Sequence, residues 1–382
     1  MKIIIVRTAA NELSGDTYNL QEIGLGSALV RAGHSCDIVY YTTGDDRFEK
    51  VQVKGTDSQI GVFYRKGKNV ASDAWFGADV DELLDSYDVV QVCDFDRLYS
   101  KHLYSKKQNV VVYHGPYKHR QAGFRGFAHQ VKSALFEAFM IRGRDWSKIN
   151  CLAKSELAES YLRLLGFESA RTIGVGFDAT KFNDVAPLPK IAKYELLAIG
   201  RLHPNKNQLI LFDMLKVLKA RGLDVHLTIV GSGEDWYSAK VRESASSEDF
   251  RHCVTLIEKV AQEEIGAYYA RSDLFLLPST YEIFGMVLLE AGRFCCPVVS
   301  SVNGGSSTLI SSSEYGWIVN GFSADEWADV VMSALQSTEA RESKARALHH
   351  RVMTEFTWDA LSKQFVQAYE SCLADCSKEP RR

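Results

Sequence analysis

Short apolar runs of strand length alternate with longer helix-like runs along this chain, and that alternation limits the fold more than any other feature. In the first half the strand-like runs are residues 2–6, 36–41, 87–92 and 109–114, and residues 18–33 form the first helix-like run. The alternation predicts an α/β fold with a parallel sheet covered by helices. Because such sheets bind ligands beyond the carboxyl ends of their strands, the residues that follow each strand are the candidate site residues.

The length of 382 residues predicts two domains, since single cores seldom exceed about 300 residues. Residues 183–193 carry two prolines within three positions, which stiffen a connection and disfavour helix. We therefore expect domains at 1–182 and 194–356, joined by a linker at 183–193.

Composition excludes several classes of protein. The net charge of −3 offers no global attraction for nucleic acid. Eight cysteines without metal-ligand spacing indicate reduced thiols and a cytoplasmic chain. Residues 1–10 are too short for a signal peptide and predict a first strand. No run of eighteen apolar residues is present, so membrane contact is expected to be peripheral at most.

Residues 278–290, PSTYEIFGMVLLE, join a strand-like run to an apolar helix expected to start near Phe284 to Met286. The first-turn amides of a helix have no intrahelical partners and can bind an anion such as phosphate. Glu282 precedes this turn and Glu290 follows inside the helix. A carboxylate accepts hydrogen bonds from two neighbouring hydroxyls, as a ribose or hexose offers. The alternative is that both glutamates are ordinary solvated charges.

The spacing Glu282-x7-Glu290 with Phe284-Gly285 between resembles the donor-site signature of retaining family 4 glycosyltransferases. The resemblance implies that Glu290 holds the ribose hydroxyls of a nucleotide sugar. It also implies that Glu282 and the backbone from Phe284 to Met286 hold the sugar and diphosphate. The base would stack near the stretch from Ile257 to Val260, largely through backbone contacts.

Arg201 and Lys206 fall just after a strand-like run, in Gly200-Arg201-Leu202 with Lys206-Asn207, and this sequence resembles the diphosphate-binding loop of the same family. Fixed cations stabilise the negative charge that develops on a departing nucleoside diphosphate. Either residue could instead be a surface cation. The implied nucleotide-sugar site comprises Arg201, Lys206, Val260, Glu282, Phe284, Gly285, Met286 and Glu290, and the implied catalytic residues are His114, Arg201, Lys206 and Glu282.

The resemblance implies the GT-B fold, two Rossmann-like domains facing across a cleft, with a C-terminal helix at about 357–374 crossing back to the N-terminal domain. It implies a retaining hexosyltransferase of polysaccharide or glycoconjugate synthesis that moves a hexose or N-acetylhexosamine, from a UDP-sugar first and a GDP-sugar next, to a saccharide or lipid-linked acceptor. No metal or other cofactor is expected, because Arg201 and Lys206 can do the work of a cation. A non-catalytic nucleotide-sugar-binding protein and a nucleotide-sugar epimerase stay open as alternatives.

In the N-terminal domain, His114 follows a strand-like run and precedes Gly115-Pro116. The resemblance implies that it binds a hydroxyl of the transferred sugar, and the alternative is a histidine capping a buried strand end. Asp94 and Asp96 are acceptor-site candidates or solvated loop acids. Tyr117 and Lys118 are further acceptor-site candidates. Residues 14–19 depart from the family, with Asp16-Thr17 where glycines are usual and Asn19 in place of a glutamate, and receive no role.

Residues 117–148 carry seven Lys or Arg against two Asp or Glu, interleaved with aromatic and apolar residues. Such a segment can lie against an anionic membrane surface. The alternative is that Phe136, Phe139 and Met140 are core positions beneath a solvated cationic face.

Overall fold

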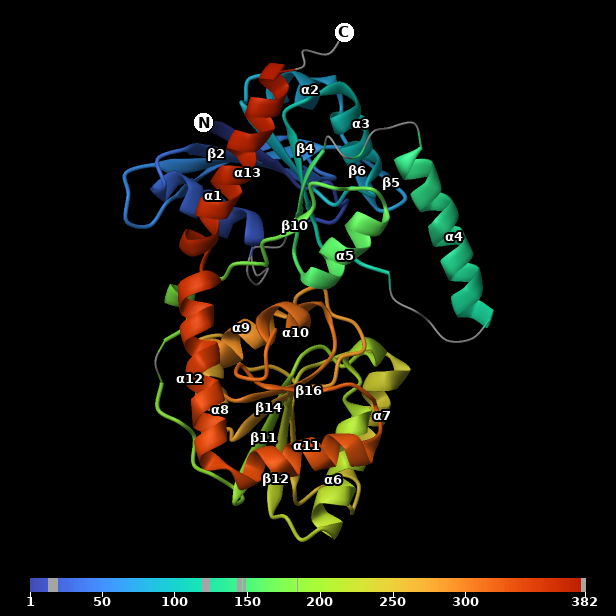
Figure 1. Cartoon of the computed structure of the whole chain (residues 1–382), viewed down its shortest axis with the longest axis vertical. Helices are drawn as coiled ribbons and strands as arrows, with labels where there is room; N and C mark the ends of the chain where they lie inside the picture. Colours follow the sequence, from blue (N-terminus) through green and yellow to red (C-terminus); the bar gives the residue numbers. More distant parts are fainter. Residues whose placement is uncertain (13–19, 119–123, 143–145, 147–148, 184, 379–382) are drawn as a thin grey trace. The chain divides into compact units, whose positions relative to one another are not determined.

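The computed structural model describes residues 1–12, 20–118, 124–142, 146, 149–183 and 185–378 (Figure 1). The chain forms two compact units. Unit 1 is Met1–Phe177 together with Thr357–Arg382, and unit 2 is Asp178–Phe356. The chain thus leaves unit 1 between Phe177 and Asp178, a few residues before the proline-containing stretch 183–193, and returns to it at Thr357.

Unit 1 is built on a sheet of eight strands in the order β10-β9-β8-β7-β1-β2-β4-β3, parallel except for the edge strand β3. A small antiparallel hairpin, β5–β6, stands apart from this sheet. The elements are β1 Lys2–Val6, α1 Gln21–Arg31, β2 Ser35–Thr42, β3 Arg47–Gln52, β4 Gln59–Lys66, β5 Lys68–Val70, β6 Asp73–Trp75, α2 Ala78–Leu84, β7 Val89–Cys93, α3 Leu98–Lys106, β8 Val110–His114, α4 Phe124–Ile141, β9 Asn150–Ala153, α5 Glu156–Leu164, β10 Arg171–Thr172 and α13 Trp358–Lys378.

Helix α13 completes unit 1 because its apolar side chains are buried there. It packs along α1 and against β7, β8 and β9. Trp358 fits only because two facing residues have no side chain: a Cβ on Gly24 would lie 2.2 Å from the indole, and one on Gly176 would lie 2.5 Å from it. Phe365 is buried and packs edge-on against Tyr113. Both aromatic residues therefore anchor the helix.

Unit 2 has a fully parallel sheet of six strands in the order β13-β12-β11-β14-β15-β16. The elements are η2 Ala179–Lys181, β11 Tyr194–Ile199, η3 Pro204–Lys206, α6 Leu209–Ala220, β12 Val225–Val230, α7 Trp236–Ser246, β13 Val254–Ile257, α8 Ile265–Arg271, β14 Leu274–Leu277, α9 Met286–Arg293, β15 Val298–Ser301, α10 Gly304–Leu309, β16 Trp317–Val319, α11 Ala324–Gln336 and α12 Thr338–Glu355.

The strand order of unit 2 is that of a Rossmann sheet. In such a sheet the chain adds strands first toward one edge and then toward the other, and this switch point lies between the first and fourth strands. Here these are β11 and β14, which are neighbours paired through Leu196 with Leu274. Residues of β11, α6 and α11 share one hydrophobic core, in which Leu196, Leu215 and Trp327 are fully buried. This core fixes the carboxyl ends of β11 and β14 side by side.

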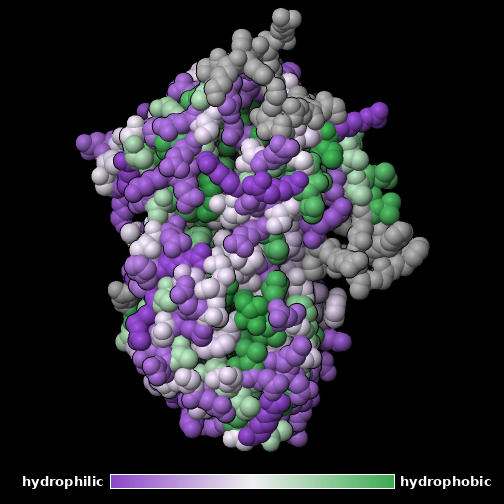
Figure 2. Space-filling view, viewed as in Figure 1, coloured by the Kyte–Doolittle hydropathy of each residue, from purple (hydrophilic) through white to green (hydrophobic). Residues whose placement is uncertain are grey.

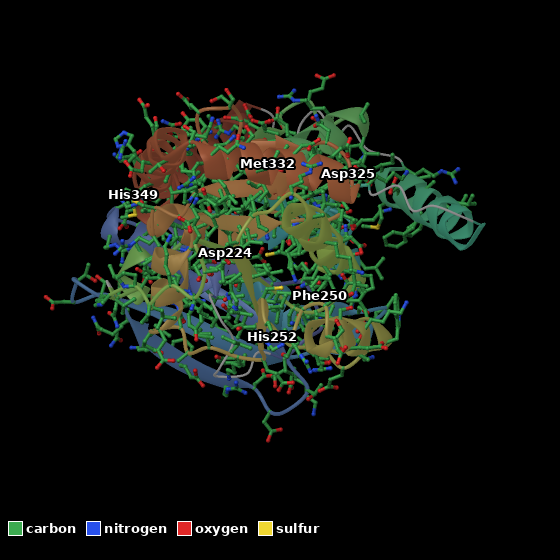
Figure 3. The ribbon with its side chains drawn as sticks, turned by 90° about the horizontal axis from the view of Figure 1, so that it is seen from below. Asp224, Phe250, His252, Asp325, Met332 and His349 are labelled. Carbon is green, nitrogen blue, oxygen red and sulfur yellow. The ribbon has the colours of Figure 1, made fainter. Side chains whose placement is uncertain are left out.

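At the amino end of the same sheet, carboxylates accept hydrogen bonds from the backbone. Figure 3 views the molecule from this end and labels Asp224, which directly precedes β12. The Asp224 carboxylate accepts a hydrogen bond from the backbone N–H of Lys193, and Asp273 accepts one from the N–H of Glu195. Because these carboxylates bind main-chain donors of neighbouring strands, they tie the start of the sheet together.

The predicted parallel α/β architecture is confirmed, since strand-like runs of the sequence such as residues 2–6 and 36–41 lie in sheet strands. Ser155 caps α5 by accepting from the N–H of Ala158. The sequence analysis missed β3 to β6, residues 47–75. The strands β3 and β5 are exposed over much of their length, so no apolar run marks them. The strand β4 does contain an apolar run that is largely buried, and β6 is only three residues long.

All eight cysteines are free in the structure. Within the part of the chain that the structure describes, no helix combines the length and apolar character needed to cross a bilayer.

Candidate functional site

The candidate site forms where the loops that follow β11 and β14 meet. The Lys206 ammonium pairs with the Glu282 carboxylate across these two loops. Their backbones are also joined, because the N–H of Thr280 donates to the carbonyl of Asn205 at 2.8 Å. The structure thus brings together two residues 76 positions apart that the sequence analysis singled out separately.

Glu282 is held from two sides. It is buried, and its Oε1 accepts hydrogen bonds from both the Lys206 ammonium and the Ser279 hydroxyl, the latter at 3.0 Å. The Lys206 side chain passes over Gly200, whose missing Cβ would lie 3.7 Å from Lys206 Cε. Charge-assisted hydrogen bonds of this kind are stronger than neutral ones, so the pair is fixed in place before any ligand arrives. Ser279 was not predicted, although it precedes Glu282 by only three residues.

Arg201 lies at the same edge of the sheet but is exposed. Its backbone carbonyl accepts from the Gln208 side-chain amide at 2.9 Å, which fixes the start of the loop. Among the described residues its guanidinium has no ion-pair partner. Arg201 therefore presents an uncompensated positive charge beside the Lys206–Glu282 pair.

Helix α9 begins directly after this loop at Met286. Its N-cap is Gly285 with φ 73°, a left-handed conformation that favours glycine. The preceding backbone is packed tightly against α10, since a Cβ on Gly305 would lie 1.7 Å from the carbonyl oxygen of Phe284. The N–H of Gly304 donates to the carbonyl of Glu282 at 3.0 Å. The start of α9, expected near Phe284 to Met286, is confirmed. Its position depends on the left-handed Gly285 and on the close approach at Gly305.

Glu290 lies on α9 and is buried, not solvated. Its Oε2 accepts a hydrogen bond from the Tyr269 hydroxyl of α8 at 2.9 Å. Tyr269 was not predicted, since nothing in the sequence relates it to Glu290. Val260 is half-buried and follows β13, so it too lies beyond the carboxyl end of a strand.

His114 is the last residue of β8, and its imidazole is fully buried. The ring packs against Phe95, and Nδ1 lies 3.2 Å from Asp94 Oδ1. This geometry fits the alternative of a histidine at a buried strand end, because the ring does not reach solvent. Contact between His114 and a sugar hydroxyl stays a prediction.

Asp94 is strained and charged. Its φ of 59° is unusual for a residue with a side chain, and its Oδ1 also accepts from the N–H of Gly115 at 3.0 Å. Burial alone would raise the pKa of Asp94, but its hydrogen bond and charge interaction with His114 hold that pKa below the ordinary value. The carboxylate therefore clamps the ends of β7 and β8 together.

The other acceptor-site candidates are dispersed. Burial raises the pKa of Asp96, and its Oδ1 has no hydrogen-bond partner in the described structure. Lys118 pairs with Glu137 of α4 at 3.0 Å, and Tyr117 is half-buried. The divergent residues 14–19 lie outside the described residues. In the described part of the chain, no three His, Cys, Asp or Glu side chains are grouped to hold a metal ion.

Residues 182–348 match the protein family described as glycosyl transferases group 1. The chain is 28% identical over 262 residues to glycogen synthase of Mycobacterium tuberculosis (strain CDC 1551 / Oshkosh), covering 68% of this chain and 62% of that protein. It is 30% identical over 187 residues to D-inositol 3-phosphate glycosyltransferase of Arthrobacter sp. (strain FB24), covering 47% of this chain and 43% of that enzyme. The chain thus spans less than two thirds of the length of these relatives.

Solved structures match over nearly the whole chain. Sucrose-phosphate synthase from Thermosynechococcus elongatus superimposes with a TM-score of 0.73 at 18% identity, covering 98% of this chain and 100% of that one. Anabaena HepE in complex with UDP superimposes with a TM-score of 0.71 at 16% identity, covering 97% and 100%. At these identities the likeness shows the fold. The chain therefore has the two-domain α/β fold of the GT-B glycosyltransferases, and its residues 182–348 are similar to the family described as glycosyl transferases group 1.

Proposed function

We propose that this protein is a retaining glycosyltransferase that moves a hexose or N-acetylhexosamine from a nucleotide diphosphate sugar to a saccharide or lipid-linked acceptor. A UDP-sugar is the first choice of donor and a GDP-sugar the second. UDP is favoured because similar solved structures are complexes of Anabaena HepE with UDP and with UDP-glucose. The product would enter a surface polysaccharide or another glycoconjugate.

One observation supports this proposal most: the Lys206–Glu282 pair and the exposed Arg201 lie together at the switch point of a Rossmann sheet, beside the start of α9. In open α/β sheets this is the position where ligands bind. Two cations and a helix N-terminus suit a diphosphate, and the Glu282 carboxylate suits sugar hydroxyls. All of these groups fall inside the region that matches the group 1 family.

The proposed chemistry is the departure of a nucleoside diphosphate. Breaking the bond between the sugar and the phosphate leaves negative charge on the diphosphate, and Arg201 and Lys206 stabilise that charge as it develops. Glu282 holds Lys206 in place beforehand, so little reorganisation is needed. Retention follows if the acceptor attacks the face from which the phosphate leaves, with a phosphate oxygen taking the proton. Because two cations already face the diphosphate, we propose that no metal ion takes part.

The acceptor is assigned to unit 1, where Asp94, Asp96, Tyr117 and Lys118 stay candidates. Peripheral contact of residues 117–148 with the inner face of a membrane, by a cytoplasmic protein, is part of the same proposal. A lipid-linked acceptor would be presented at such a surface.

Donor binding is tested first. UDP-, GDP- and ADP-sugars are screened for the rise in melting temperature that a ligand of the native state produces. We expect one UDP-sugar to stabilise the protein and Arg201→Ala to abolish that shift. If no nucleotide sugar shifts the melting temperature, the proposed donor site is wrong.

Transfer is tested next by NMR analysis of products, with the stabilising donor and a panel of saccharide and lipid-linked acceptors. We expect a new glycosidic bond of the same anomeric configuration as in the donor. A converted donor formed without any acceptor would instead identify an epimerase. Binding with neither transfer nor slow donor hydrolysis would identify a non-catalytic binding protein.

A further inference from the structure

Four apolar side chains in the described part of helix α4 are exposed. Leu135 is 68% exposed and Phe139 57% exposed, and Val131 and Phe136 are exposed as well. The inward face includes Glu137 and Met140, which are buried. Phe136 and Phe139 are therefore not core positions, contrary to the alternative considered from the sequence, whereas Met140 is. In Figure 2 hydrophobic residues gather at the right edge, where the second half of α4 lies.

The outward residues follow the helix period. Val131, Leu135 and Phe139 are four positions apart, so they lie one above the other on a single face. Arg142 comes three positions after Phe139, directly after the helix, and is exposed. The apolar stripe of α4, as we name Val131, Leu135, Phe136 and Phe139, thus ends at a cation.

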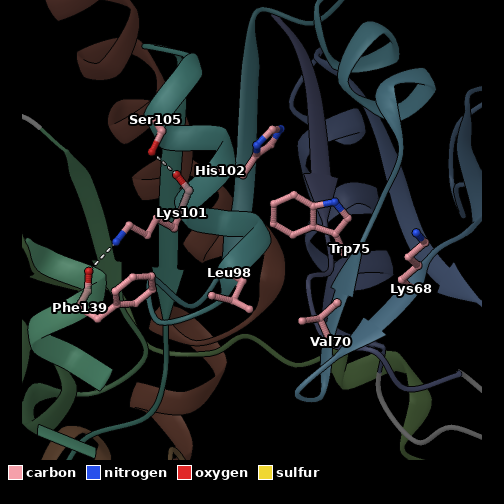
Figure 4. A pocket seen from close by; sticks show the side chains of 8 residues that line it. All are labelled: Lys68, Val70, Trp75, Leu98, Lys101, His102, Ser105 and Phe139. Atoms are coloured by element: carbon pink, nitrogen blue, oxygen red, sulfur yellow. Dashed lines mark hydrogen bonds between the residues drawn. The ribbon is translucent and has the colours of Figure 1, made fainter. Parts of the chain in front are cut away.

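The stripe continues into a cavity of about 590 Å³ between α3, α4 and the β5–β6 hairpin (Figure 4). Phe139 belongs to both the stripe and the cavity. Trp75 and Val70 of the hairpin are exposed apolar side chains that face it from the other side. The described residues that line the cavity are Lys68, Val70, Trp75, Leu98, Lys101, His102, Ser105 and Phe139.

The cavity is positively charged. Of the eight described residues that line it, two are lysines and none is acidic. Lys68 stands directly across the hairpin from Trp75, and the Lys101 ammonium donates to the carbonyl of Phe139, which holds α4 beside α3.

Two described carboxylates on the elements α2 and α4 have cationic or histidine partners. Asp81 binds His102 at 2.7 Å, with the Lys106 ammonium 3.7 Å away, and the buried Glu137 binds Lys118. The described lining of the cavity therefore combines apolar side chains with lysines and contains no carboxylate.

We propose that the apolar stripe and the cavity together form the docking surface for an anionic phospholipid bilayer. Lys68 and Arg142 contact lipid phosphates, while Leu135, Phe139 and Trp75 enter the boundary between headgroups and acyl chains. Tryptophan and outward apolar residues beside Lys or Arg are the combination that such an interface selects. This inference deepens the proposed membrane contact of residues 117–148, adds the β5–β6 hairpin to it, and does not depend on the donor site.

The test is co-sedimentation of the full chain with vesicles of pure phosphatidylcholine and of phosphatidylcholine with 30% phosphatidylglycerol. We expect binding to the anionic vesicles only, weakened at high salt because the cations are exposed. A blue shift of tryptophan emission on binding should be absent in Trp75→Phe. Equal binding to both vesicles, or no binding to either, would overturn the proposal.

Two leucine variants distinguish a specific role of the docking surface from the effect of adding a negative charge anywhere on unit 1. Leu135→Glu places a charge in the stripe and should lower vesicle binding at least tenfold. Leu164→Glu is the matched control, since Leu164 is an 86% exposed leucine of α5 in the same unit and should bind as the parent does. Lys68→Ala should weaken binding about fivefold. If Leu135→Glu binds as well as Leu164→Glu, the docking surface is not here.

Two further readouts separate the possible failures. Light scattering of the lipid-free protein should show no concentration-dependent dimer that Leu135→Glu dissolves, because such a dimer would mean that the stripe binds a second copy of the chain. Thermal stabilisation by UDP-sugars should be equal in Leu135→Glu and the parent. If the parent protein binds UDP-sugars but no vesicles, the proposed membrane contact fails and the proposed donor site stands. If it binds anionic vesicles but no nucleotide sugar, the donor site fails and the docking surface stands.

Discussion

The two sheets have their reversal points at comparable places, between β11 and β14 in unit 2 and between β1 and β7 in unit 1, yet they use charge differently. In unit 2 the Lys206–Glu282 pair lies beside the exposed Arg201. In unit 1 Asp94 binds the buried His114. The same topology thus places an exposed cation at the switch point of unit 2, where a ligand could bind it, and a half-buried carboxylate at the switch point of unit 1, where it joins two strand ends. We therefore expect substitutions in unit 2 to affect chemistry and those around Asp94 to affect stability.

The largest effect is expected for Lys206→Ala in unit 2. Removing one preorganised charged donor costs about 3 kcal/mol in the transition state, so turnover should fall about 100-fold or more. The rate of sugar transfer is measured with the purified variant. Lys216→Ala is the matched control, because Lys216 is an exposed cation of the neighbouring helix α6. Transfer by Lys206→Ala at the parental rate would remove this residue from the site and erase the contrast between the units.

Asp94→Asn tests the other half of the comparison. It should lower the free energy of unfolding by about 2 kcal/mol at pH 7, because buried groups lose a charged hydrogen-bond partner. The pKa of Asp94 is lowered in the folded protein, so its stabilisation is present above the unfolded pKa of about 4 and is lost as the pH falls toward the folded value. Urea unfolding at pH 7, 5, 4 and 3 should show the gap between parent and variant closing below about pH 4.

Asp96 should make the opposite contribution to the pH dependence of the free energy of unfolding, because burial raises its pKa. Asp96→Asn tests this. A carboxyl group of this kind favours the folded state in its neutral form, and that advantage is lost as the pH rises through its folded pKa. The amide should therefore be tolerated at pH 7. If Asp94→Asn unfolds as the parent does at every pH, Asp94 does not hold the strand ends.

Glu290→Ala should weaken binding of the nucleoside diphosphate about tenfold, since a hydrogen bond to a charged group contributes about 1.5 kcal/mol or more. Calorimetry measures the dissociation constant. Tyr269→Phe keeps the carboxylate and removes only the hydroxyl that orients it, so its effect should be smaller. An unchanged dissociation constant in Glu290→Ala would mean that the buried carboxylate has only a structural role, as Asp94 does in unit 1.

The smallest effect is expected on chelation. If Arg201 and Lys206 neutralise the diphosphate, EDTA should change the transfer rate less than about twofold, because the protein supplies the charge itself. Adding Mg²⁺ afterwards should then have no effect. A rate that collapses in EDTA and returns with Mg²⁺ would show that the two cations of unit 2 are insufficient.

Sequence patterns predicted most of the framework. Apolar runs and their alternation identified the buried parallel strands, and the glycine and glutamate spacing identified the loop before α9. They did not identify β3 and β5, since these strands are largely exposed and lack an apolar run, or the three-residue strand β6. The apolar run of β4 was a usable signal that the sequence analysis overlooked. They also could not relate Tyr269 to Glu290 or Ser279 to Glu282, because no periodic pattern reports a side-chain contact.

The amino-acid sequence by itself determined the class of fold and the identity of the charged residues near strand ends. Strand burial and helix amphipathicity are local properties that a residue pattern records. Only the tertiary structure decided that Lys206 pairs with Glu282, that His114 is closed off, and that Phe139 faces outward. Pairing and exposure depend on which distant segments come together, and that is settled by packing over the whole sheet.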